Sequence, residues 1–528
     1  MRSLVWWSLV ACGGGTDEMD VTGDPSDPSA PPVDTGTSVV TKGPKPCESE
    51  AGLVVESAMV EQPWSEHEAR FTVSLSSSAA LAVACALDGD DTEVHLVEGV
   101  EAQLDHTLRL AGLLASSTYT CTVAPVCPTT TEVPTVLTLQ TGDESNSDLP
   151  QMNLEVHQAS AGRDYVLTNH QRNDGWNGQR RLVVDRDAQV RWRAAANAGG
   201  GVGGSAVNWS PTSQAFTIGG GWPPNHNGRP QQIELFGSDV RYDSAVALGD
   251  LNATWFHHDA RELSDGQFLT LEEPVIQRPG GGTFRGFGVR IVDPETDEVT
   301  FDWSSQRPFD EGNLPGGGGD AYHANWVDIV DVDGQDVMYV SLCTQGWTVA
   351  VDVPSGDWRW TFGRNGDFDL VDTDGNALPD SEYPQCQHGL QRRDDRLLVY
   401  DNGNQRGFSR AVEYRLDEST MTATKLWDWT EPQWYETSLG GVDYTSGERV
   451  LIAMGHIEAA TPTPGDRTSF VEVDPTTGEK LWEVQYDSVH DMAFRAEAIS
   501  PCAIFANAKY CPVVAERLET LAPVLDPS

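Results

Sequence analysis

Short apolar runs, separated by polar turn dipeptides such as D-G, D-D, S-G and T-G, follow one another along residues 143–528. Runs of this kind, rich in β-branched and aromatic residues and bounded by turn residues, are typical of β-strands. The pattern therefore predicts an all-β region. The composition agrees with it, because 51 Gly, 31 Pro and 17 Trp suit a turn-rich sheet protein better than a helical one.

A tail of the form D-x-x-(T/S)-G-x-x-x-W recurs along this region. Its clearest copies end at Trp360 and Trp482, and looser copies end at Trp192, Trp303 and Trp427. The last four of these Trp residues lie about 55 to 67 residues apart, which is at the long end for repeats of one four-stranded sheet each. We count six such units, although five or seven remain possible because the first two are indistinct. The tails predict a six-bladed β-propeller in which the Trp residues pack the core of the blades.

Three of the predicted strands begin with a histidine ahead of an apolar run. These are His258 in FHHDARELSDGQ, His323 in YHANWVDIV and His388 in QHGLQRRDD. Equivalent positions of successive blades converge on the axis of a propeller, so we expect these histidines to form one cluster. A zinc site made of histidines alone is an alternative use of such a cluster.

The chain ahead of the propeller divides into three segments. Residues 1–12 combine Arg2, a short apolar stretch and the run LVAC, which resembles a bacterial lipobox ending at Cys12. Residues 13–50 are Gly, Pro, Asp, Ser and Thr, and we expect a disordered acidic linker. Residues 51–142 return to alternating runs and predict a small β-sandwich. We expect export and attachment to the cell envelope by a lipid on Cys12 alone; a misassigned start codon would be compatible with the same export.

Within residues 51–142, the stretch L-x-L-x-G-L-x-x-x-T-x-Y from Leu108 to Tyr119 resembles the fibronectin type III signature. In that family the Tyr packs near a strand start and the Leu anchors the preceding loop. The resemblance implies a spacer or docking module, and we assign it no chemistry.

The formal net charge is −46, from 34 basic and 80 acidic residues. Such a charge repels phosphate backbones and anionic lipid headgroups, so we expect no nucleic-acid partner. Solubility, in a salty medium for instance, explains the charge without an acid-specific function.

Nine cysteines include Cys12, which leaves an even number for disulfides in an exported chain. No C-x-x-C pair is present, so we expect no structural zinc site. Connectivity cannot be read from a sequence, and our assignment is Cys85 with Cys121, Cys47 with Cys127, Cys343 with Cys386, and Cys502 with Cys511.

An insertion between the fourth tail and His388, residues 362–385, contains Asp372, Asp374 and Asp380. Calcium binding is one interpretation, but the Gly that follows the second Asp immediately breaks the EF-hand spacing. We expect instead an ordered rim loop over the axial mouth.

The region from about residue 160 to 500 resembles the bacterial arylsulfate sulfotransferases. The resemblance rests on HHD, Y-H-x-N, W-x-x-G-R-x-x-D-F, Q-H and D-N-G in this order, and residues 322–404 carry its most specific part. It implies an exported six-bladed propeller, often preceded by a small β-domain. It also implies transfer of a sulfuryl group from a phenolic sulfate to a phenol through a sulfurylated histidine, without a phosphoadenosyl cofactor.

The resemblance assigns the site residue by residue. His388 would be the nucleophile, and His323 and His258 would handle protons or bind the sulfuryl oxygens. Flanking family positions are matched by Asn325, Asp401 and Asn402. The residues that we expect to bind substrate are His257, Asn325, Arg364, Asn402, Arg406 and Arg495.

Two residues depart from the family pattern. Cys343 stands where the family usually has an Arg, and Gly389 stands where an Asp commonly follows the nucleophile. Loss of one such donor would remove about 3 to 4 kcal/mol of transition-state stabilisation unless another guanidinium replaces it. Arg364, Arg406 and Arg495 are the candidates, and we favour Arg406, which like Arg364 flanks the strand carrying His388.

The chemistry of the residues agrees with sulfuryl transfer. The reaction needs a nucleophile that is neutral at working pH, which an imidazole with a pKa near about 6.5 supplies, and donors around the sulfuryl oxygens. We expect no cofactor and no bound metal. Two other functions stay open: a non-catalytic surface propeller that binds a ligand or partner, and a quinone or metal oxidoreductase, since similar tails occur in quinoprotein propellers.

Overall fold

The computed structural model describes residues 53–62, 65–126, 134–143, 149–172, 180–195, 206–219, 231–235, 240–243, 256–296, 298–432, 434–455 and 467–525. The predicted signal and linker, and the assigned pair Cys47–Cys127, lie outside these residues. No helix within the described ranges is long and apolar enough to span a membrane.

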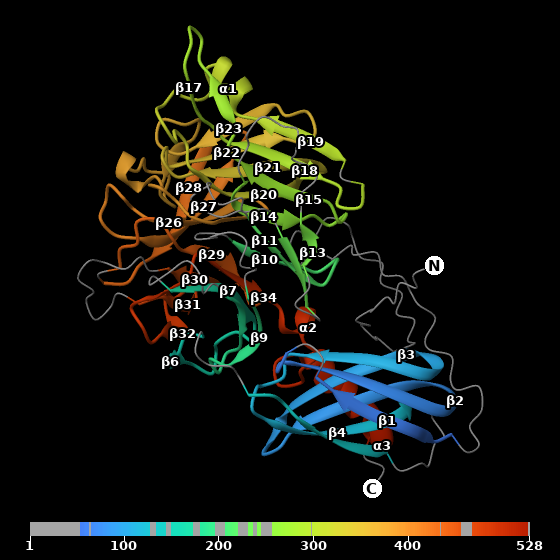
Figure 1. Cartoon of the computed structure of the whole chain (residues 1–528). Coiled ribbons are helices and arrows are strands. Elements are labelled where there is room, and N and C mark those ends of the chain that lie inside the picture. The colour runs from blue at the N-terminus through green and yellow to red at the C-terminus, as the bar shows by residue number, and fades with distance from the viewer. Residues whose placement is uncertain are drawn as a thin grey trace, which may run out of the picture.

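Six sheets form a six-bladed propeller, which confirms the predicted fold (Figure 1). The first blade holds β7 (Tyr165–Arg172), β8 (Arg180–Val184) and β9 (Val190–Ala195), together with β33 (Asp491–Met492) and β34 (Ala496–Ile499). The second holds β10 (Val207–Ser210), β11 (Ala215–Ile218), β12 (Gln231–Glu234) and β13 (Val240–Asp243). The third holds β14 (Phe256–Glu262), β15 (Phe268–Glu272), β18 (Gly288–Val292) and β19 (Val299–Ser304), beside the hairpin β16 (Val275–Gln277) and β17 (Thr283–Arg285) and the short α1 (Gln306–Asp310).

Three further blades complete the ring. The fourth holds β20 (Ala324–Val332), β21 (Gln335–Leu342), β22 (Trp347–Asp352) and β23 (Trp358–Phe362). The fifth holds β25 (Leu390–Arg393), β26 (Arg396–Asp401), β27 (Arg410–Asp417), β28 (Thr422–Trp429) and β24 (Asp369–Val371), with the short 3₁₀ helix η2 (Asp380–Glu382) after β24. The sixth holds β29 (Gly441–Tyr444), β30 (Val450–Met454), β31 (Ser469–Val473), β32 (Lys480–Tyr486) and β6 (Met152–His157).

The two ends of the propeller segment close the ring. The late strand β34 pairs with β7 of the first blade, and the early strand β6 pairs with β32 of the last blade. Each of these two sheets therefore contains strands from both ends of the segment. This exchange ties blades one and six together without a covalent bond.

The recurring tails form tight turns, and their Trp residues connect neighbouring blades. In two copies the glycine adopts a left-handed backbone, with φ of +72° at Gly356 and at Gly478, where any other residue would be strained. The tail Trp then reaches the next blade: the indole of Trp303 donates to Gly356 O at 3.0 Å, and that of Trp482 donates to Arg186 O at 2.8 Å. Each Trp thus joins one blade to the turn of its neighbour.

The insertion after the fourth tail differs from the expectation of a rim loop over the mouth. Its strand β24 pairs in parallel with β28, the outermost strand of the fifth blade. The Asp372 carboxylate accepts backbone N–H groups of Asp374 and Asn376 at 2.9 and 2.8 Å, and Asp380 pairs with Arg364. The carboxylates thus serve local turns and ion pairs, and part of the insertion widens the blade.

The N-terminal module is one continuous five-stranded sheet around its own core. It contains β1 (Val55–Glu61), β2 (Glu68–Leu87), β3 (Asp90–Ala111), β4 (Thr118–Val126) and β5 (Thr135–Gln140). The long β2 pairs with β1 along its first half and with β4 along its second, so the sheet folds over, and β1 also contacts β5. The fibronectin type III resemblance remains a prediction.

The C-terminus leaves the propeller and packs on this module. Helices α2 (Pro501–Ile504) and α3 (Pro512–Leu525) follow β34, and Val514 and Leu521 of α3 are buried with Ala82 and Leu96 of the module. Figure 1 shows this red segment lying across the blue strands. Three of the assigned disulfides are present: Cys85–Cys121, Cys343–Cys386 and Cys502–Cys511.

Candidate functional site

The three histidines sit at the heads of the innermost strands of three consecutive blades. His258 lies on β14, His323 directly precedes β20 and His388 lies two residues before β25. The first strands of neighbouring blades contact each other around the axis, as β14 does with β20. The repeat therefore brings together histidines that are far apart in the sequence.

A left-handed residue at each strand head turns the chain toward the axis. The φ angles are +54° at His258, +47° at His323 and +76° at Gly389, the residue after His388. A side-chain-bearing residue pays about 1 to 2 kcal/mol for this conformation, and such strain collects at functional sites. A Cβ at Gly389 would also lie 3.1 Å from Gly441 Cα, so glycine fits here on two counts.

His258 and His323 face each other through their Nε2 atoms at 3.3 Å. On its other side, His323 Nδ1 donates to Asp320 Oδ2 at 2.6 Å, and the His323 backbone N–H donates to Asp320 Oδ1 at 3.0 Å. The carboxylate holds the proton on Nδ1, so His323 presents Nε2 to the axis. An imidazole held in this way can exchange a proton with a bound molecule.

Asp320 was not among the residues expected from the sequence. The available signal was a carboxylate three residues ahead of a histidine, at the end of the glycine run GGGGD. A second carboxyl group, that of Glu273, interacts with Asp320. Burial raises the pKa of Glu273 to about 7, and the negative charge of Asp320 adds to this effect. Glu273 also pairs with Arg285 at 3.0 Å.

His388 is held in one tautomer. Its Nδ1 lies 2.9 Å from Asn402 Oδ1 and 3.4 Å from Cys386 O. The amide of Asn402 is oriented because its Nδ2 donates to Glu436 O and Leu439 O at 2.8 and 2.9 Å. Both neighbours of Nδ1 are acceptors, so Nδ1 carries the hydrogen and Nε2 carries the lone pair.

The His388 imidazole is also kept neutral. Burial lowers its pKa to about 3, assisted by the positive charges of His323 and Arg495. A neutral ring with its lone pair on a defined nitrogen is a nucleophile at any ordinary pH.

Arg495 supplies a guanidinium beside His388. An ideal Cβ on Gly389 would lie 3.5 Å from Arg495 Nε, which places this nitrogen against the residue that follows His388. The guanidinium donates to Asp259 Oδ2 at 3.0 Å and to Asn325 O at 2.8 Å, while Nε is a buried donor without a partner among the described residues. The Nε–H of Arg495 is therefore left to donate to a ligand.

The other two candidate arginines are engaged elsewhere. Arg364 is half exposed and pairs with Asp380, and Arg406, which we favoured from the sequence, pairs with Asp401 and donates to Ser381 O at 3.0 Å. The Arg406 side chain, which we expected to extend toward the axis, instead binds Asp401, the residue before Asn402. The structure thus sets Arg495, not Arg406, next to His388.

The remaining expected residues support the strand heads. Asn325 is fully buried and donates to Gln387 O at 2.9 Å, which fixes the residue before His388. The side chain of His257 lies outside the described residues. Phe494 was not expected from the sequence; it stacks on His258 at 5.3 Å and meets His388 edge-on at 6.3 Å, so it forms an apolar wall of the site.

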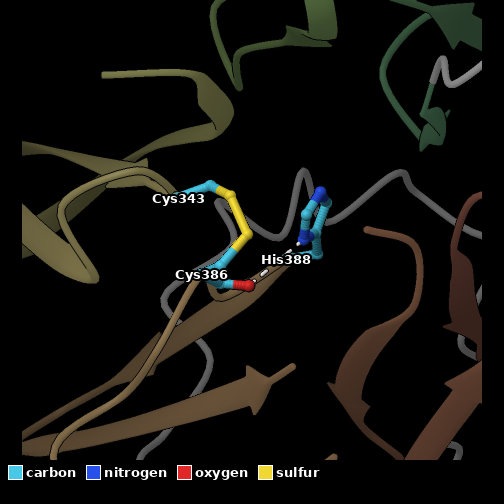
Figure 2. Close-up of side chains that lie close together, drawn as sticks. All are labelled: Cys343, Cys386 and His388. Atoms are coloured by element: carbon cyan, nitrogen blue, oxygen red, sulfur yellow. Dashed lines mark hydrogen bonds between the residues drawn. A yellow bond between two sulfur atoms is a disulfide. The ribbon is translucent and has the colours of Figure 1, made fainter. Parts of the chain in front are cut away.

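Cys343, at the position where a guanidinium was expected, is bonded to Cys386. Figure 2 shows this disulfide beside the His388 ring. The two sulfurs and a His388 nitrogen all lie within 4.8 Å of one another. The disulfide therefore ties the segment leading to His388 to the end of β21.

The model of the family described as Arylsulfotransferase (ASST) matches residues 154–495, well over half of the chain. No curated protein matches the chain. Among solved structures, the chain is similar to the periplasmic gluconolactonase PpgL of Pseudomonas aeruginosa, with 12% identity, 60% of this chain and 94% of that chain covered, and a TM-score of 0.33.

Two other solved structures are similar at the same level. They are the dihydro-heme d1 dehydrogenase NirN, with 11% identity, 77% and 73% coverage and a TM-score of 0.30, and AztD of Citrobacter koseri, with 10% identity, 80% and 98% coverage and a TM-score of 0.26. At this identity the matches say nothing about function.

Proposed function

This chain belongs to the arylsulfotransferase (ASST) family, and we propose on that basis that it moves a sulfuryl group from a phenolic sulfate to a phenolic acceptor through a sulfurylated His388. The observation that carries the proposal is the fixed tautomer of His388. Its Nδ1–H is held by Asn402 Oδ1 and Cys386 O, so the lone pair of Nε2 is available to attack sulfur.

In the first half-reaction, Nε2 of His388 forms a bond to sulfur while the bond between sulfur and the phenolic oxygen breaks. The departing phenolate takes a proton from His323, whose Nε2 faces the axis and whose Nδ1 stays bonded to Asp320. In the second half-reaction the acceptor phenol returns a proton to His323 and attacks the sulfurylated His388. The phenolic sulfate of the acceptor leaves, and both histidines regain their starting states.

The sulfuryl oxygens gain negative charge as the bond to the phenol breaks. Arg495 Nε–H and the imidazole of His258, which faces His323, are donors that can stabilise this charge. Arg495 then fills the function of the guanidinium that Cys343 replaces. Phe494 offers an apolar face for the aryl ring.

The test is release of nitrophenol from a nitrophenyl sulfate in the presence and absence of a phenol. We expect release only with the acceptor, and its loss in His388→Ala. His157→Ala, which alters an exposed histidine on β6, serves as the matched control and keeps the parental rate. Turnover by His388→Ala equal to that of the parent would place the nucleophile at another residue.

A propeller that binds a ligand without turnover is the second candidate. The observation in its favour is the disulfide of Cys343 at the position of the expected guanidinium. In that case the parent and His388→Ala would both bind an aryl sulfate in calorimetry, and neither would release phenol.

We also propose that the protein works outside the cytoplasm, as a lipoprotein attached through Cys12. Three disulfides support an extracytoplasmic location, because cytosolic thiols are kept reduced. Cys12→Ser is expected to move the protein from the membrane fraction to the released fraction.

A further inference from the structure

We infer that Cys343, Cys386 and His388 form a binding site for a thiophilic metal ion of the Zn²⁺ or Cu⁺ class once a thiol reductant opens the disulfide between the two cysteines. Each residue offers one ligand atom, and the three atoms lie within 4.8 Å of one another. Figure 2 shows Cys343 from one segment meeting Cys386 and His388, which lie two residues apart on another. Within the described residues, no other group of three His, Cys, Asp or Glu side chains meets the same spacing.

The two cysteines keep their places when the bond between them opens. The backbone of Cys343 donates to His323 O at 3.2 Å, and that of Thr344 donates to Tyr322 O at 3.1 Å. Cys386 lies between Gln385, whose N–H donates to Asp401 at 2.8 Å, and Gln387, whose amide donates to Trp347 O at 2.5 Å. These bonds do not involve sulfur, so reduction leaves both side chains facing His388.

The spacing suits a small tetrahedral ion. Two thiolates about 2.3 Å from a zinc ion stand about 3.7 Å apart, which is also close to the contact distance of two sulfur atoms that share no bond. The third donor, a His388 nitrogen already within 4.8 Å of both sulfurs, has to move by about 1 Å. Two thiolates and an imidazole are a donor set that zinc and cuprous copper prefer over magnesium or calcium.

The chemistry balances with a reductant of the thiol class. Two monothiols give up two electrons and two protons and become one disulfide, and Cys343 and Cys386 become thiols. Binding of the metal ion then releases two protons to solvent, because thiols coordinate as thiolates. Water completes the coordination.

The disulfide is accessible to such a reductant. Cys343 and Cys386 are both partly exposed, whereas Cys85 and Cys121 are fully buried in the N-terminal module. A mild thiol should therefore open Cys343–Cys386 before Cys85–Cys121.

Coordination would remove His388 from chemistry whichever nitrogen binds. At Nε2 the metal ion takes the lone pair itself, and at Nδ1 it displaces the hydrogen to Nε2. The metal-loaded form is thus unable to carry a sulfuryl group, so that the same three residues define an active oxidised state and an inhibited reduced state. This consequence rests on the proposed function, while the metal site itself does not.

The test is a Cd²⁺ titration of the full chain, followed by the ultraviolet charge-transfer band of cadmium–thiolate bonds. Protein treated with a thiol reductant and freed of it under nitrogen is expected to bind Cd²⁺ with this band, and the oxidised protein is not. The double variant Cys343→Ser/Cys386→Ser should lose the band, and the matched double variant Cys502→Ser/Cys511→Ser should keep it. His388→Asn should weaken Cd²⁺ binding by roughly 10-fold or more, as loss of a metal contact does.

The result that would overturn the inference is a band in the reduced parent no larger than that of Cys343→Ser/Cys386→Ser, with circular dichroism showing both folded. If the double variant does not fold, single variants at Cys343 and Cys386 replace it, and each must reduce the band. Because the band requires no turnover, the result is decided even if the protein transfers no sulfuryl group. If transfer does occur, Zn²⁺ should inhibit the reduced enzyme and a chelator should restore it.

Discussion

At His388 a buried imidazole is held in one protonation state and one tautomer. The two acceptors at Nδ1 set the tautomer, and burial sets the charge. Asn402 is the residue that connects His388 to the loop of Glu436 and Leu439. The position of the lone pair thus depends on the orientation of the Asn402 amide.

Removing that amide should lower activity without removing the nucleophile. We expect Asn402→Ala to reduce kcat by roughly 10²- to 10⁴-fold, because the imidazole can then carry its hydrogen on Nε2. Asn404→Ala is the matched control, since its amide donates to Thr437 O in the same loop but does not touch His388. Equal losses in both variants would show that loop packing, not the tautomer, governs the rate.

The pKa of His388 has a consequence for stability. The native state keeps the ring neutral down to about pH 3, while the unfolded chain binds a proton below about pH 6.5. The free energy of unfolding therefore does not depend on this group above about pH 6.5. As the pH falls from there toward 3, the free energy of unfolding decreases by roughly 1.4 kcal/mol per pH unit. Urea unfolding of the parent and of His388→Asn should be measured across this pH range. The other titrating groups are common to both proteins, so the difference between the two free energies of unfolding should show this slope. A difference that does not change with pH would contradict it.

At the scale of elements, the site depends on strand heads that leave the regular strand. The ladder of β14 shifts register between Phe256 and Ala260, and that of β20 shifts between Ala324 and Trp326. His258 and His323 occupy the left-handed positions next to these shifts. At each strand head the shift in register interrupts the alternation of side chains that a regular strand would impose.

Gly389→Ala separates backbone strain from displacement of the site. The new Cβ would lie 3.1 Å from Gly441 Cα at a φ of +76°, so we expect a loss of about 1 to 2 kcal/mol of stability and a large loss of activity. Gly375→Ala carries similar strain, with a φ of +84°, but its Cβ meets open space. It should lose comparable stability and no activity; an active Gly389→Ala would mean that the His388 segment tolerates displacement.

The blades and the histidine cluster could be predicted from the sequence because both follow a local repeat. Turn dipeptides and tail Trp residues marked the strands, and the shared position of His258, His323 and His388 marked the axis. Closure of the ring by β34 and β6 could not be predicted, since it pairs residues more than 300 positions apart without a local signal. Arg495 was one of three candidate arginines, and only the contacts with Asp259 and Asn325 show which of them lies near His388.

At the scale of the whole molecule, a buried ionic cluster joins the N-terminal module to the propeller. Arg191 of β9 is 1% exposed and pairs with Glu93 of β3 and with Asp185, both fully buried. Tyr510, ahead of α3, donates to Asp185 at 3.0 Å. Module, first blade and C-terminal segment therefore share one set of charges.

Breaking this cluster should loosen the module. Arg191→Met leaves two buried carboxylates without their guanidinium, and we expect a loss of about 3 to 5 kcal/mol and faster proteolysis of residues 53–143. Arg193→Met, two residues along and paired with the less buried Glu66, should cost about 1 kcal/mol or less. Similar losses in the two variants would mean that the module is held by apolar contacts instead.

Every step of the proposed transfer passes through a sulfurylated His388. The most direct measurement is mass spectrometry of the protein mixed with an aryl sulfate in the absence of acceptor. The sample is kept at neutral or alkaline pH, because the N–S bond of a sulfurylated imidazole is acid-labile. We expect one sulfuryl group on the peptide that contains His388, its disappearance when a phenol is added, and no adduct in His388→Ala. An adduct on another residue, or acceptor-dependent turnover with no adduct on His388, would contradict it.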